Sequence, residues 1–364
     1  MADLSGTGGF SVLVPFSSPS AKNGTSSTDL IWHFQRHWAE IFHMPHSHEI
    51  ISLSKTNSLV RNTILAITAC HLRHVSPGIL QHRIAEHFQQ SLALQDYQRA
   101  LDTPRKELGQ SGINALLLSA VLLNMLAFAL PESGTASDEL DPSTSWVFSP
   151  REDRLGWLAL QAGLRPLLIS MVAYLDKARS FLSSIFLGSE EESWPFPGVG
   201  RGLEVVPEIW IKVFGLDGAG GSDCETAGSA DAVDAPDNQN RAAGRANPGD
   251  VFRSPVTALV QLRDLEPVRL NVFKNLYFLG KVQSEFRALL YDRDERALWL
   301  FGYWLGLMCR FKVVWWCDKR VRRDYKAIRM WLEQLHLTER PGIEGEMWTE
   351  LMEEFQMAPV FVRM

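Results

Sequence analysis

The chain has 364 residues, of which 46% are hydrophobic and 21% charged. This length exceeds what one hydrophobic core usually organises, so one large domain or two lobes are both allowed. The net charge is −6, from 36 Lys and Arg against 42 Asp and Glu. A weakly acidic chain lacks the overall positive field that supports non-specific nucleic-acid binding, so a DNA contact would require a local basic patch.

The N-terminal segment and the cysteines constrain the location of the protein. Residues 1–28 are rich in Ser and Gly and do not form a secretory signal, so we expect a flexible leader there. The four cysteines are scattered singly, which favours a reducing compartment and excludes a zinc site made of thiolates. They are Cys70, Cys224, Cys309 and Cys317.

Apolar residues recur at spacings of three and four, which predicts helices, whereas no alternation of period two persists long enough to predict a sheet. The first predicted helix has Ser26 or Thr28 as its cap and ends at Pro45. The next runs from about residue 56 to the turn at residues 76–78, and a third covers residues 79–101. Helical patterning continues around residues 157–168, with a kink or break expected there.

Residues 113–130 form a nearly continuous apolar run that is about long enough to cross a bilayer. Polar residues interrupt this run, and a second apolar run at residues 297–317 contains Arg310 and Lys312, which hydrocarbon penalises. We therefore expect no membrane insertion. Both runs are predicted to be helices in the interior of a bundle, hydrophobic on all sides.

Residues 215–250 contain almost no large apolar side chain, so they cannot offset the entropy of ordering and are predicted to be a disordered linker. This linker either separates two lobes or marks an insertion. The sequence thus predicts an all-α bundle of about ten helices, with a first helical part at 29–214 and a second at 251–364.

Five histidines near the N-terminus suggest a metal site, because His33 and His37 share a helix face. The others are His43, His46 and His48. No Glu lies between the first pair as in zinc proteases, so we expect no metal and no cofactor. The glycines at 198, 200 and 202 follow prolines, which predicts a turn and not a phosphate loop, and a GxSxG nucleophile motif is lacking in the sequence.

Two clusters in the C-terminal part are candidate sites. Aromatic side chains offer large rigid apolar surfaces, so they are a candidate pocket for a hydrophobic ligand, although core packing is the default interpretation of such residues. These residues are Trp299, Tyr303, Trp304 and Trp315. A basic string that follows them is a candidate nuclear import signal or an ordinary solvated helix face. Its residues are Lys319, Arg320, Arg322 and Arg323.

Five segments, in their order and spacing, resemble the C-terminal regulatory domain of fungal zinc-cluster transcription factors. They are residues 30–34 (LIWHF), 62–72 (NTILAITACHL), 85–94 with Ala85, His87 and SLAL, 154–165 with RLGWL and GLR, and 296–316 with RALWLFGYW and the final WW. No six-cysteine zinc cluster precedes residue 30, and that module is the part of the family that reads DNA.

The resemblance implies an all-helical regulatory domain that acts in the nucleus on RNA polymerase II transcription and carries out no catalysis. Its expected partners are the transcriptional machinery or other regulators, a homodimer is allowed, and DNA is a partner only if a zinc cluster lies upstream. The missing cluster has three explanations: a lost first exon, a paralogue that works through partners, or drift to another role. A helical enzyme that uses His33 and His37, a helical interaction module and a sensor of a small hydrophobic ligand remain alternatives.

Overall fold

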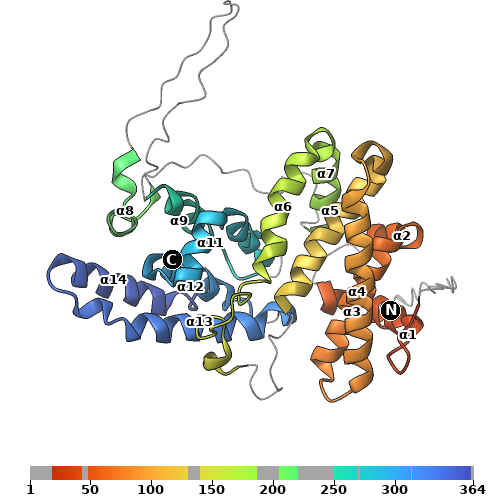
Figure 1. The fold of residues 1–364 in the computed structure, drawn as a ribbon, viewed down its shortest axis with the longest axis horizontal. Helices are drawn as coiled ribbons and strands as arrows, with labels where there is room; N and C mark the ends of the chain where they lie inside the picture. Colours follow the sequence, from red (N-terminus) through yellow and green to blue (C-terminus); the bar gives the residue numbers. More distant parts are fainter. Residues whose placement is uncertain are drawn as a thin grey trace, which may run out of the picture.

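The computed structural model describes residues 19–42, 48–129, 140–186, 205–219, 249–268, 271–312 and 314–361. These residues form fourteen α-helices and no β-strand, so the all-α prediction is confirmed (Figure 1). The number of helices exceeds the expected ten because several of them are short. The helices α2, α8, α10 and α11 have between 5 and 9 residues.

Figure 1 shows the helices in chain order, with α1 to α4 on one side of the molecule, α8 to α14 on the other, and α5 to α7 between them. Their bounds are α1 (Ser27–Phe42), α2 (His48–Thr56), α3 (Ser58–Val75), α4 (Leu80–Asp102), α5 (Arg105–Ala129), α6 (Leu158–Ser170), α7 (Leu175–Phe186), α8 (Glu208–Phe214), α9 (Asp250–Leu262), α10 (Asn271–Asn275), α11 (Ser284–Asp292), α12 (Glu295–Met308), α13 (Trp315–Gln334) and α14 (Ile343–Met357).

The first helix begins where its capping residue predicts. The Ser26 hydroxyl accepts a hydrogen bond from the backbone N–H of Asp29 at 3.1 Å, which satisfies one of the free N–H groups of the first turn. The residues just before α1 also contact the helical body, because the Gln89 side chain of α4 donates to the carbonyl of Pro19 at 3.0 Å. The expected leader therefore ends earlier than residue 28, and its residues 1–18 lie outside the described part of the chain.

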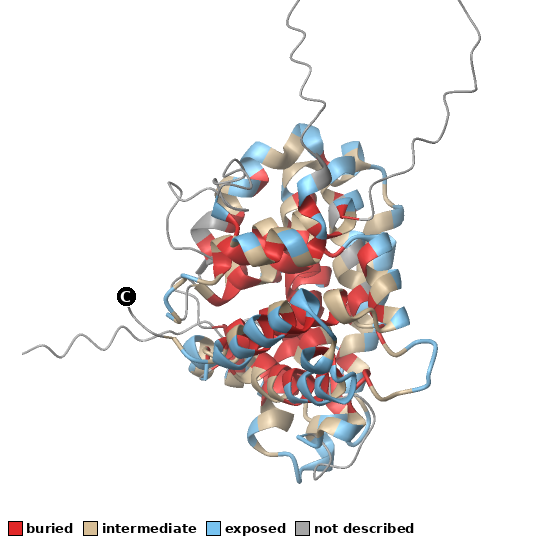
Figure 2. Cartoon of the chain, turned by 90° about the vertical axis from the view of Figure 1, so that its left-hand side faces the viewer, coloured by how far each residue is buried: buried red, intermediate tan, exposed pale blue. Residues whose placement is uncertain are grey.

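Helix α5 occupies the interior of the molecule, as its composition predicts. It packs against α3, α4, α6, α7 and α13. Of the residues in its most apolar stretch, 78% are buried. By length and composition alone, α5 is the one helix in the described residues that could span a membrane. Figure 2 shows buried residues concentrated at the centre of the molecule and exposed residues on the outer helices.

The two helical parts share one hydrophobic core. Phe128 of α5 contacts the Trp316 ring of α13, with ring centroids 5.9 Å apart. Most of the predicted linker, residues 220–248, lies outside the described part of the chain, but its two ends meet. A Cβ placed on Gly249 would lie 2.0 Å from the carbonyl oxygen of Gly215, which favours an insertion over a connection between separate lobes.

Every residue of α12 from Ala297 to Met308 is buried. The helix can be enclosed this closely because two glycines face its neighbours. A Cβ on Gly302 would lie 2.6 Å from the Phe355 ring of α14 and 2.7 Å from the side chain of Ile328 of α13. Helix α12 ends at Met308, within the apolar run of residues 297–317 that the sequence predicted to be one helix. Arg310 therefore lies between α12 and α13 and not inside a helix.

The close approach at Gly302 makes a direct prediction. Gly302→Ala should lower the free energy of unfolding by about 1–3 kcal/mol, since an added methyl group overpacks a core that has no space for it. Urea unfolding measures this change. Gly163→Ala in α6 is the matched control: its Cβ would meet nothing within 4 Å, so it should be neutral or stabilise by up to about 1 kcal/mol. Equal effects of the two substitutions would show that α12 is not packed in this way.

Candidate functional site

A groove with a volume of about 630 Å³ lies where the end of α9, the end of α12 and the end of α14 meet. It is open to solvent on one side, and its wall combines apolar side chains with charges of both signs. The lining residues are Arg263, Asp264, Glu266, Tyr303, Arg310, Glu354, Met357, Ala358, Val360 and Phe361.

Glu354 in the groove wall is the centre of a hydrogen-bonded group. One carboxylate oxygen of Glu354 accepts a hydrogen bond from the Tyr303 hydroxyl at 3.2 Å, and the other accepts from the Trp210 indole N–H at 2.8 Å. Tyr303 is buried, and its ring stacks on Trp299 with centroids 5.0 Å apart. Burial raises the pKa of Glu354, although both hydrogen bonds act in the opposite direction. Burial also raises the pKa of Tyr303 well above its ordinary value.

Arg310 holds the walls of the groove together. Its guanidinium donates to the carbonyl of Ala358 at 2.7 Å and to the carbonyl of Arg263 at 2.6 Å. These carbonyls belong to the C-terminal ends of α14 and α9, where helices leave acceptors unsatisfied and the helix dipole favours a cation. One side chain on the segment after α12 therefore fixes the positions of two neighbouring helix ends.

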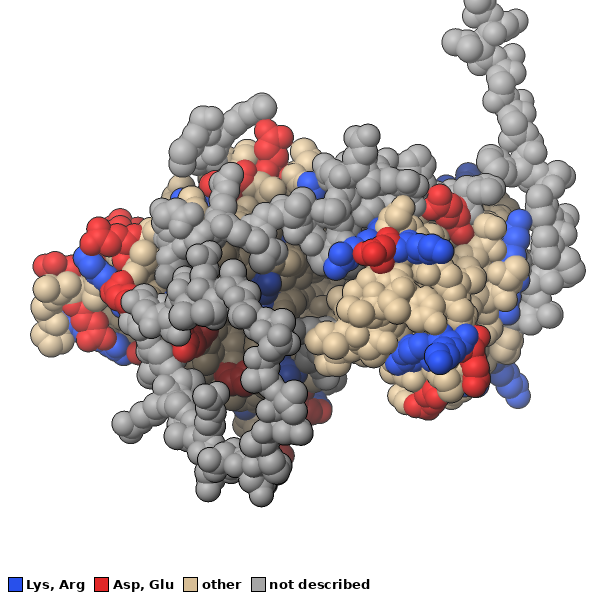
Figure 3. All heavy atoms as spheres, turned by 90° about the horizontal axis from the view of Figure 1, so that it is seen from above, with Lys and Arg blue, Asp and Glu red and all other residues tan. Residues whose placement is uncertain are grey.

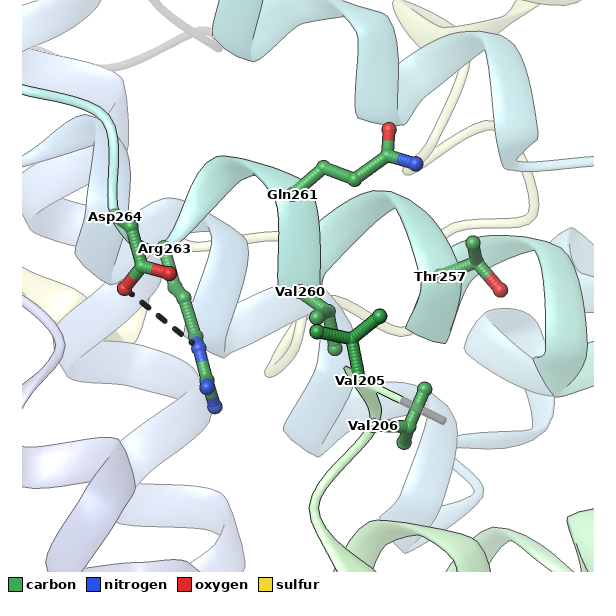
Figure 4. Close-up of a pocket in the computed structure, with 7 residues that line it drawn as sticks. All are labelled: Val205, Val206, Thr257, Val260, Gln261, Arg263 and Asp264. Carbon is green, nitrogen blue, oxygen red and sulfur yellow. Dashed lines mark ion pairs between the residues drawn. The ribbon is translucent and has the colours of Figure 1, made fainter. Parts of the chain in front are cut away.

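A smaller pocket of about 50 Å³ adjoins the groove and shares Arg263 and Asp264 with it. Figure 4 shows this ion pair at one end of the pocket, with Val205, Val206 and Val260 closing it and Gln261 pointing away. The Arg263 and Asp264 side chains are 3.7 Å apart. Carboxylates, guanidinium groups and apolar side chains together make the groove suited to hold a small amphipathic molecule by non-covalent contacts.

The four aromatic residues of the predicted pocket do not line one cavity. Of these, Tyr303 lines the groove, whereas Trp299 and Trp304 are buried in the core and donate their indole N–H groups to the carbonyls of Leu351 and Asn275. Core packing thus explains these two tryptophans. Trp315 lies at a different junction, where it contacts α1 and α3.

The basic string of α13 is not a uniform solvated face. Arg320 is only 6% exposed and donates to the carbonyls of Phe128 and Ala127 at the end of α5. Arg323 is buried too, and it pairs with the buried Asp324 at 2.9 Å. The expectation of an exposed basic helix face is therefore wrong at these positions, because the cations satisfy buried acceptors.

The other two residues of the string are more accessible. Lys319 is half-buried, and Arg322 pairs with Asp318 at 2.6 Å on the surface. On the face seen in Figure 3, the visible Lys and Arg side chains are interspersed with Asp and Glu. The described residues on that face do not form a basic patch.

The histidines near the N-terminus are partly described. Within the described residues, no group of three His, Cys, Asp or Glu side chains is arranged to hold a metal ion. His33 contacts His71 of α3, and His37 lies 3.0 Å from the exposed carboxylate of Glu40. The backbones of His43 and His46 and the side chain of His48 lie outside the described part of the chain, as does the glycine motif at residues 198–202.

Sequence patterns did not single out the charged residues of the groove. Arg263, Arg310 and Glu354 are far apart in the chain, and each belongs to a different segment. A weak signal was present at Arg310, a cation that interrupts an otherwise apolar run. Such a residue indicates either a helix end or a buried partner.

No protein-family model matches the chain, and neither a curated protein nor a solved structure is significantly similar to it. The resemblance to the fungal regulatory domain therefore stays a prediction that rests on the residues quoted for it.

The contrast between Arg320 and Arg322 can be measured. Arg320→Ala should lower the free energy of unfolding by about 2–4 kcal/mol, since it leaves buried carbonyls at the end of α5 without donors. Arg322→Ala removes a surface ion pair and should cost less than about 1 kcal/mol. Chemical unfolding of both variants gives the comparison. Similar losses at the two positions would contradict the role of Arg320 as a cap of α5.

The half-buried carboxyl of Glu354 predicts a pH dependence of stability. Because its folded pKa is raised, its contribution to stability is present below the unfolded pKa of about 4.3 and is lost as the pH rises through the folded pKa. In Glu354→Gln an amide that cannot ionise replaces the carboxyl, so the variant should gain stability relative to the wild type as the pH rises from about 4 to about 7.

Urea unfolding of both proteins at several pH values tests this prediction. Glu346→Gln, at an exposed position on the same helix, controls for the change in net charge. A stability difference between Glu354→Gln and the wild type that does not change with pH would count against a raised pKa of this carboxyl.

Proposed function

We propose that the chain is a helical regulatory domain of a fungal transcription regulator, which acts in the nucleus on RNA polymerase II transcription through partner proteins. The proposal starts from the five segments that carry the family resemblance. The observation that supports it most is that these segments, although separated by up to about 260 residues in the chain, are linked by direct contacts.

Three of the segments lie on α1, α3 and α4, which pack as neighbours. Trp315, in the fifth segment, donates its indole N–H to the carbonyl of Ile41 and packs its ring against His71. In the fourth segment, Trp157 packs against Phe301 of α12, with ring centroids 6.2 Å apart. A family that shares a fold keeps similar residues at positions that contact one another in the core. The contacts between these segments therefore support the resemblance.

The groove beside α12 supplies the regulatory part of the proposal. We assign it as the site of a small amphipathic effector, since its apolar wall can hold a hydrophobic body while Glu354 and Arg263 can bind polar groups. An effector bound there would touch the ends of α9 and α14 at once. It would thereby bias how these helices pack on α12 and how they are presented to a partner.

The same groove favours one alternative, a small-molecule sensor without a transcriptional role. A tethering experiment separates the two functions. The chain is fused to a heterologous DNA-binding domain in a fungal host, and the transcript of a reporter gene is measured. The transcriptional proposal expects a change from the level given by the DNA-binding domain alone. An unchanged transcript, with the fusion folded and present in the nucleus, would support the alternative.

The groove itself is tested by filling it in the same fusion. Met357 lines the groove and is 53% exposed, so Met357→Trp adds bulk there without disturbing the core. Met330→Trp on α13 is the matched control, because Met330 is 40% exposed and is not part of the groove wall. We expect Met357→Trp to alter the reporter output and Met330→Trp to leave it unchanged. The same output from both fusions would remove the groove from the proposed function.

A further inference from the structure

Three imidazole rings and one indole ring form a continuous row of ring contacts where α1, α3 and α13 meet. His33 and His37 both belong to α1, and their rings stack on each other with centroids 4.4 Å apart. His33 Nε2 then lies 3.1 Å from Nδ1 of His71 on α3. The ring of His71 contacts the Trp315 ring of α13, with centroids 5.0 Å apart and nearly perpendicular planes. We call His33, His37, His71 and Trp315 the histidine clasp.

The contact between His33 and His71 requires that at least one ring is neutral. A neutral imidazole has one nitrogen that donates and one that accepts, so the two facing nitrogens can form a hydrogen bond. When both rings are protonated, both nitrogens carry hydrogens and two positive charges face each other. His71 is only 4% exposed, so water does little to screen this repulsion.

The surroundings mostly favour the uncharged state. Burial, together with the neighbouring His33 and His74, lowers the pKa of His71 to about 4. Burial also lowers the pKa of His33, with further lowering from His37 on its own helix and from His82 on α4. Glu40 on α1 acts in the opposite direction on both rings, but its side chain is 68% exposed and therefore largely screened.

The clasp lies where α1 is held to the rest of the molecule. Leu30, Phe34 and Ile41 bury the apolar face of α1, and the Trp315 indole N–H donates to the carbonyl of Ile41 at 2.9 Å. Repulsion between His33 and His71 acts directly across this interface. Release of α1 would expose the buried apolar faces of both α1 and α3.

We propose that the histidine clasp is an acid-responsive contact, which holds α1 against α3 and α13 while His33 and His71 are uncharged and releases α1 when both are protonated. This device does not depend on the groove or on the transcriptional role. Its direction follows from proton linkage: the released state binds protons more tightly than the docked state, so acid favours release. The change should develop as the pH falls from about 6.5, the pKa of an unperturbed histidine, towards about 4.

Hydrogen exchange of the full chain, read out by mass spectrometry, tests the proposal. Exchange of the α1 amides, corrected for the intrinsic pH dependence of the chemistry, should increase about 20-fold between about pH 7 and about pH 5. The amides of α12 report global unfolding, and their protection should fall much less. Unchanged protection of α1 over this range would overturn the proposal.

The double variant His33→Gln, His71→Asn keeps polar groups near the facing nitrogens but cannot be protonated. Its α1 exchange should rise less than about threefold over the same range. His87→Gln, at an exposed position on α4, removes a histidine outside the clasp and should respond as the wild type does. A double variant that still releases α1 as the wild type does would show that other groups cause the release.

The wild type provides a second test that does not require any variant to fold. Titration of the histidine ring protons by NMR should show His71 still uncharged at about pH 5. A His71 ring that titrates near about 6.5 in the folded protein would contradict the clasp.

Discussion

The structure depends on enclosing two helical segments that have no polar face. Helix α5 from Ile113 onward and helix α12 from Ala297 onward are buried around almost their whole circumference, so each must be surrounded by other helices before the chain can be stable. Their neighbours supply this cover from both halves of the sequence: α13 packs on both of them, while α3 and α4 cover α5 and α14 covers α12. The need to bury these two segments joins the two predicted parts, residues 29–214 and 251–364, in one hydrophobic core.

Burial of this kind creates a second requirement, because polar atoms taken into the core need partners. Two tryptophans of the predicted ligand pocket find such partners in backbone carbonyls. The indole N–H of Trp299 donates to the carbonyl of Leu351, and that of Trp304 donates to the carbonyl of Asn275. Arg320 donates hydrogen bonds to carbonyls at the end of α5, and Arg310 donates to carbonyls at the ends of α9 and α14. The groove lies next to Arg310. Its shape therefore follows from the positions in which the hydrogen bonds of Arg310 hold the ends of α9, α12 and α14.

Local sequence rules were sufficient for the fold class and for much of the first half of the chain. Spacings of apolar residues gave α3 and α4 closely, since prolines and a polar turn limit them, and Ser26 caps α1 as expected. The same rules missed α2 and the other short helices, because segments of 5 to 9 residues carry too few turns to show a period. They also treated Arg320 and Arg323 as surface residues, since charge alone does not reveal a buried acceptor.

The candidate site was less predictable than the fold for a physical reason. Tyr303 was predicted as a pocket residue, but Glu354 and Arg263 join it only through tertiary packing, which no local pattern encodes. Native-state hydrogen exchange in low denaturant tests the shared core most directly. If α5 and α12 depend on each other, their slowest amides should exchange with the same free energy, which equals that of global unfolding. Exchange of α5 through a separate opening of lower energy, with α12 still protected, would contradict the account.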